Sequence, residues 1–119
     1  MTNRSRQTGT RWESAIVDYL RANGRPFVER RTLGGGGNDR GDITGLPAVV
    51  IEAKACKAVS IGAWLKELDA EIANDLARSK DDATTGALWV KTRGKTSARD
   101  GYIVMRPDVY LALLREAGY

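Results

Sequence analysis

The chain has 119 residues, of which 42% are hydrophobic and 29% are charged, and its formal net charge is +4. This length and composition predict a single soluble globular domain and indicate neither a disordered nor a membrane protein. The sequence has one cysteine and no histidine. These counts exclude an internal disulfide, a Cys/His zinc site, and Ser-His-Asp or Cys-His catalysis, so any metal must be bound by oxygen.

The distribution of charge is uneven along the chain. Basic residues gather in residues 1–31 and 91–106, whereas residues 65–85 are acidic. This asymmetry favours a polyanion such as nucleic acid as the partner of one side of the fold, although a solvated charged surface explains it equally well. The sequence has no apolar run with the length of a signal peptide or membrane span, so we expect a cytoplasmic protein with no membrane partner.

The N-terminal residues predict an arm followed by a helix. Residues 1–9 are polar and bear arginines, and we expect a mobile basic arm there, before one domain of residues 10–119. Thr10 and Glu13 have the spacing of a capping box, which predicts a helix over about residues 11–22. Glu13 has a second interpretation, because it also borders the apolar face of this helix and can point inward.

The next segment combines a strand with a glycine-rich loop. Residues 26–32 are predicted to form a strand with Phe27 and Val28 buried. Four consecutive glycines at residues 34–37 predict a flexible loop at the tip of a hairpin. This loop is either a plain connection or a flap whose backbone approaches a phosphate chain. Three arginines beside it are candidate nucleic-acid ligands: Arg30, Arg31 and Arg40.

The central prediction concerns the segment from Arg40 to Lys54. Two runs rich in β-branched residues flank the turn residues Gly45-Leu46-Pro47, which predicts an antiparallel hairpin. If the hairpin is centred near Pro47, Asp42 lies opposite Glu52, and the alternation of side chains places Lys54 on the same face. The opposite face is then apolar, with Ile43, Val49, Ile51 and Ala53.

Two facing carboxylates need either a shared proton or a cation between them. Because all available ligands are oxygens, this pair suits Mg²⁺, or Mn²⁺ as a substitute. A register slip of one residue would put Asp42 and Glu52 on opposite faces. The alternative interpretation is an ordinary edge hairpin, in which Asp42 caps a turn while Glu52 and Lys54 are solvated.

The remaining sequence predicts a helix, two strands and a last helix. Apolar residues repeat every three or four positions over about residues 61–79, which is typical of an amphipathic helix. Residues 86–91 and 101–106 are predicted strands, and a helix is expected to begin at Pro107. The loop between the strands holds residues that are either further candidate nucleic-acid ligands or simply solvated: Lys91, Arg93 and Lys95.

That loop also contains Gly94-Lys95-Thr96, which resembles the end of a nucleotide phosphate-binding loop. The resemblance fails because Trp89 occupies the position of the required glycine, and no helical pattern follows. We therefore expect no nucleotide cofactor.

The predicted order of elements and motifs resembles the PD-(D/E)XK nuclease superfamily, and within it the small Holliday-junction resolvases of archaea and phages. The resemblance covers most of the chain and rests on Glu13, Gly41-Asp42, Glu52-Ala53-Lys54 and the basic loop of residues 91–100. Gly41 stands where the motif has proline. The resemblance implies an α/β, restriction-endonuclease-like fold, with a mixed sheet of about five strands flanked by helices in the order α-β-β-β-α-β-β-α.

The resemblance also implies an activity and roles for the site residues. Asp42 and Glu52 would bind Mg²⁺ together with the backbone carbonyl of Ala53, and Glu13 would complete the shell directly or through water. Lys54 would orient the attacking water or stabilise the transition state. The implied protein is a homodimeric, metal-dependent endonuclease that cuts DNA four-way junctions in a bacterial, archaeal or phage-infected cell. The alternatives are a restriction-like or repair nuclease of the same superfamily, and a non-catalytic DNA-binding module of the same fold.

Overall fold

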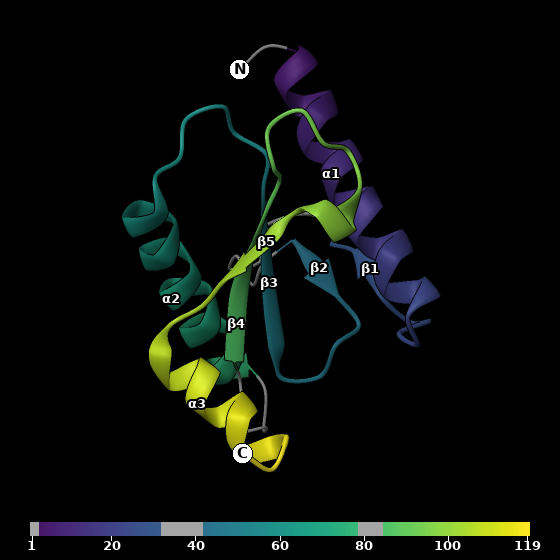
Figure 1. Cartoon of the computed structure of the whole chain (residues 1–119). Coiled ribbons are helices and arrows are strands. Elements are labelled where there is room, and N and C mark those ends of the chain that lie inside the picture. Colours follow the sequence, from purple (N-terminus) through teal and green to yellow (C-terminus); the bar gives the residue numbers. More distant parts are fainter. Residues whose placement is uncertain (1–2, 32–41, 79–84) are drawn as a thin grey trace.

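The computed structural model describes residues 3–31, 42–78 and 85–119. It is an α/β structure in which one mixed five-stranded sheet is accompanied by three helices (Figure 1). The elements in chain order are α1 (Asn3–Ala22), β1 (Glu29–Arg30), β2 (Ile43–Thr44), β3 (Val49–Lys54), α2 (Ile61–Arg78), β4 (Thr85–Val90), the 3₁₀ turn η1 (Ala98–Asp100), β5 (Tyr102–Val104) and α3 (Pro107–Glu116). Across these described segments, no helix combines the length and apolar character needed to cross a membrane.

The strands lie in the sheet in their sequence order, β1-β2-β3-β4-β5. Neighbours are antiparallel except for β3 and β4, which run parallel in register from Val49 opposite Thr85 to Lys54 opposite Val90. The parallel pair requires the long connection through α2. The carboxyl ends of β3 and β4 therefore lie side by side, and the loops that leave them start at the same edge of the sheet.

Two apolar clusters hold α1 and α2 on opposite sides of the sheet (Figure 1). On the α1 side, Trp12 and Ile16 pack with Ile51, and the indole of Trp12 donates a hydrogen bond to the Trp89 carbonyl at 3.0 Å. On the α2 side, Leu68 packs with Val50. Because side chains alternate along β3, Glu52 and Lys54 must face α2 rather than α1.

The predicted hairpin and its register are confirmed. Strands β2 and β3 are antiparallel, with Ile43 paired with Ile51, as a centre near Pro47 requires. The side chains of both isoleucines belong to the α1 cluster. Asp42 is one residue before Ile43, so its side chain takes the face of Glu52.

The prediction for the start of the first helix is wrong. Helix α1 begins at Asn3, so residues 3–9 form its first turns, and Thr10 and Glu13 are interior helical residues that cannot form a capping box. Trp12 and Ile16 anchor the helix through tertiary packing, and no proline interrupts the polar residues before them. Capping-box spacing alone therefore misplaced the helix start.

The prediction for the first strand is also wrong in part. Strand β1 covers only Glu29–Arg30, and Phe27 is 83% exposed, although Val28 is fully buried as predicted. The chain turns just before the strand, where the Val28 amide donates to the Arg25 carbonyl at 3.4 Å. This turn directs Phe27 outward. The glycine-rich loop and Arg40 lie outside the described residues.

Gly45, in the turn of the hairpin, packs against the backbone of Phe27 and Val28, and a comparison with Gly24 tests this contact. Gly24 and Gly45 both have positive φ angles, of 87° and 96°. A Cβ at Gly24 meets open space, whereas one at Gly45 would overlap the Phe27 carbonyl group and lie 2.9 Å from Val28 Cα. Both alanine variants lose stability through backbone strain. We expect Gly45→Ala to lose roughly 1–3 kcal/mol more than Gly24→Ala in urea unfolding; equal losses would contradict this packing.

Candidate active site

The structure brings the two carboxylates of the predicted pair together. Glu52 lies in the middle of β3, faces α2 and is 7% exposed. Asp42 lies just before β2, and its Oδ2 accepts a hydrogen bond from the backbone amide of Ala53 at 2.8 Å. This bond holds the Asp42 carboxylate against β3 next to Glu52. The alternative of a solvated Glu52 on an edge hairpin is wrong, because Glu52 is buried.

The carboxyl group of Glu52 is in an unfavourable environment for a charge. Its Oε2 is buried and has no hydrogen-bond partner among the residues that the structure describes. Burial and the neighbouring carboxyl of Glu71 raise the pKa of Glu52 to about 8, against the opposing effects of Asp42 and Lys54. In the absence of a bound metal ion, Glu52 therefore holds a proton at neutral pH.

Lys54 is the cation of the site. Its Nζ lies 2.7 Å from Glu67 Oε2 on α2 and 3.6 Å from Glu52 Oε1, and 5.7 Å from the ring centroid of Trp64. Burial opposes the charged form, but the hydrogen bond to Glu67 and the nearby carboxylates leave the pKa of Lys54 raised. The lysine is thus held in place as an ammonium ion, next to the Asp42–Glu52 pair.

Glu13 approaches the site from the other side of the sheet. Its Oε2 accepts a hydrogen bond from Arg30 Nε at 2.9 Å. Arg30 is paired with Ile43, whose side chain belongs to the α1 cluster, so this ion pair lies on the α1 side. Burial and the charge of Asp42 raise the pKa of Glu13, against Arg30. Glu13 is therefore close enough to sense Asp42, but it comes from the face opposite to Glu52.

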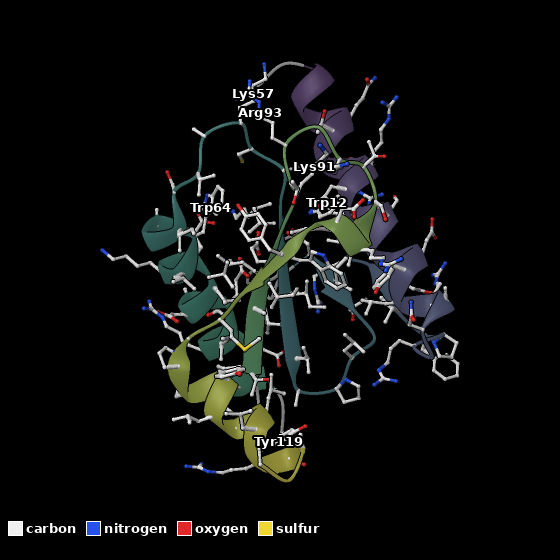
Figure 2. All side chains as sticks on the ribbon, viewed as in Figure 1. Trp12, Lys57, Trp64, Lys91, Arg93 and Tyr119 are labelled. Carbon is white, nitrogen blue, oxygen red and sulfur yellow. The ribbon has the colours of Figure 1, made fainter. Side chains whose placement is uncertain are left out.

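Basic residues surround the edge of the sheet where β3 and β4 end. The Lys91 amide donates to the Lys54 carbonyl at 2.8 Å, so the basic loop after β4 begins directly beside the site lysine. Lys91 also lines a cleft of about 210 Å³ with Arg11. Figure 2 shows Lys91, Arg93 and Lys57 at the same end of the molecule. Arg93 and Lys95 are exposed.

The predicted arginine ligands differ in their surroundings. The guanidinium of Arg30 is bound by Glu13, whereas Arg31 contributes its backbone amide, which donates to the Asp42 carbonyl at 2.8 Å. Arg40 falls in the part of the chain that is not described. The structure thus ties Arg30 and Arg31 to the acidic site, one through an ion pair and one through the backbone.

Two acidic residues of α2 were missed by the sequence analysis, which treated this helix as apolar packing. Glu67 contacts Lys54, and Glu71, 4% exposed, lies next to Glu52. A signal was present in the sequence. Glu71 is three residues after Leu68 and seven after Trp64, so its side chain falls within the apolar face of the helix.

The residues present have the chemistry of a site for a hard divalent cation. The donors are carboxylate oxygens, and Glu52 offers a buried oxygen that no described residue hydrogen-bonds. Within the described residues, no three acidic or cysteine side chains stand close enough around one point to hold an ion as they are. A bound ion would therefore have to draw the carboxylates around it, with the raised pKa of Glu52 falling as the cation replaces the proton.

Comparisons with protein-family models, with curated proteins and with solved structures find no match. The function is therefore inferred from the residues of the site and their geometry.

Proposed function

We propose that this protein is a metal-dependent, structure-selective DNA endonuclease of the PD-(D/E)XK type with a restriction-endonuclease-like fold, and that it resolves four-way junctions. The observation that carries the proposal is the pairing of Asp42 with Glu52 across the hairpin of β2 and β3. One oxygen of Glu52 is buried without a hydrogen-bond partner among the described residues, and the Lys54 ammonium lies 3.6 Å from the other. A buried acid paired with a half-buried one, with a cation adjacent, is costly to keep for structure alone.

In this proposal, Asp42 and Glu52 hold Mg²⁺ or Mn²⁺ with the backbone carbonyl of Ala53. When bound, the ion makes a water molecule easier to deprotonate and neutralises charge that develops on the scissile phosphate. Lys54 stays protonated, because its pKa is raised. An ammonium cannot act as a base, so Lys54 stabilises the negative charge of the transition state or orients the attacking water.

The basic residues near the site supply the contacts to DNA. Lys91 and Arg11 line one cleft, and exposed Arg93 and Lys95 extend the positive surface along the loop after β4. Such groups bind phosphates without reading base sequence, which suits an enzyme that selects DNA by its shape. A four-way junction needs paired cuts on two strands, so we propose a homodimer with two sites related by a two-fold axis.

A cleavage assay tests the proposed function. The protein is incubated with a mobile four-way junction, a linear duplex and a single strand of DNA, each with Mg²⁺ or with EDTA. We expect paired nicks near the branch point of the junction in Mg²⁺, also in Mn²⁺, and none in EDTA. Equal cutting of the linear duplex would instead indicate a restriction-like or repair nuclease, and binding without cutting would indicate a non-catalytic DNA-binding module.

A further inference from the structure

Helix α2 directs a buried acid toward the candidate metal site. Glu71 is 4% exposed, and its helix packs on β3 and β4 through Leu68 and Trp64. The carboxyl of Glu71 disfavours ionisation of Glu52 through a side-chain hydrogen bond and through its charge. The two acids therefore meet in the layer between α2 and the sheet, on the face where Lys54 also lies.

Such a pair is unfavourable without a bridging group. Two buried carboxyls cannot both be charged at short range unless a cation lies between them, and a protonated pair still removes polar groups from water. An apolar side chain at position 71 would pack with Leu68 and Trp64 at no such cost. Among the described residues, Glu52 Oε2 is buried without a hydrogen-bond partner, so this oxygen of the pair is available to a ligand.

Glu13, unlike Glu71, lies on the side of the sheet opposite to Glu52. Its carboxylate is engaged by Arg30 at 2.9 Å on the α1 side of the sheet, whereas Glu52 faces α2. For Glu13 to reach an ion bound at Glu52, it would have to leave Arg30 and pass the edge of the sheet. Glu71 already lies on the correct face.

We propose that Glu71, rather than Glu13, supplies the third carboxylate that holds the divalent cation, so that the ion links α2 to β3. This inference rests on the proposed metal dependence. A link between a helix and the sheet also makes cation binding stabilise the fold, because the unfolded chain offers no such arrangement of oxygens.

The experiment measures Mn²⁺ binding without DNA, by isothermal titration calorimetry and by the shift in thermal unfolding. Glu71→Gln is expected to lower Mn²⁺ affinity by at least about tenfold and to abolish most of the thermal shift. Glu13→Gln is expected to bind Mn²⁺ as the wild type does. The matched control is Glu116→Gln, which makes the same chemical change at an exposed position of α3; its affinity should change by less than about threefold.

Two results would overturn the inference: Glu71→Gln binding Mn²⁺ as tightly as the wild type, or the loss appearing in Glu13→Gln instead. If Glu71→Gln does not fold, Glu71→Asp is used instead, because it retains a carboxylate retracted by one methylene. We expect Glu71→Asp to bind Mn²⁺ measurably but more weakly than the wild type. Unchanged Mn²⁺ binding by Glu71→Asp would also overturn the inference. If the wild type itself binds no Mn²⁺, the proposed metal dependence fails as well, so the two failures are distinguishable.

Discussion

Replacing Asp42 with Asn, or Glu52 with Gln, is expected to lower the rate of junction cleavage in Mg²⁺ by at least about a hundredfold while junction affinity is retained. Residues that only support metal ligands already account for about 10–100-fold effects, so a direct ligand should exceed that range. Both substitutions preserve the size of the side chain and remove its negative charge. Affinity depends mainly on basic groups that contact phosphates, which these variants leave in place.

The design separates chemistry from binding and folding. Cleavage is measured under single-turnover conditions in Mg²⁺, and affinity is measured in EDTA by fluorescence anisotropy of a labelled junction. Asp108→Asn and Glu116→Gln are matched controls, because they make the same chemical changes at exposed positions of α3. We expect wild-type rates from both. A loss of affinity or of folding in the Asp42 and Glu52 variants would mean that these side chains are structural.

The central hairpin could be predicted because its determinants are local. Turn residues at positions 45–47 separate two runs of β-branched residues, and the alternation of side chains then fixes which residues share a face. The same short-range patterns predicted α2 and the start of α3 at Pro107 correctly. From these, the proximity of Asp42 and Glu52 followed without knowledge of the rest of the chain.

The features that sequence analysis missed depend on contacts between distant segments. Helix α1 begins at Asn3, and Trp12 and Ile16 hold it against strands far away in sequence, a contact that no local capping pattern records. The position of Glu71 beside Glu52 depends on how α2 crosses the sheet. Its spacing from Leu68 placed it on the apolar face, but only the packed structure shows which strand residue it meets.

The metal-free protein is expected to lose stability as the pH rises from about 4.5 to about 8. The pKa of Glu52 is raised from 4.5 to about 8 in the folded state. The folded protein therefore holds a proton that the unfolded chain releases across this interval, and stability that is fully present below pH 4.5 is lost as the pH rises through 8. The expected loss is on the order of a few kcal/mol, and the raised pKa of Glu13 adds to it with the same sign.

Urea unfolding in EDTA at several pH values measures this loss, and Glu52→Gln isolates the contribution of Glu52, because glutamine keeps the shape without the titrating group. As the pH rises, the free energy of unfolding should fall less steeply for Glu52→Gln than for the wild type. The variant should therefore be more stable than the wild type by the largest amount at pH 8. Parallel curves for the two proteins would mean that Glu52 ionises normally and that the site is more open than its burial indicates. Added Mn²⁺ should restore stability to the wild type at pH 8 and not to the variant, since a cation can take the place of the proton only where the carboxylate is present.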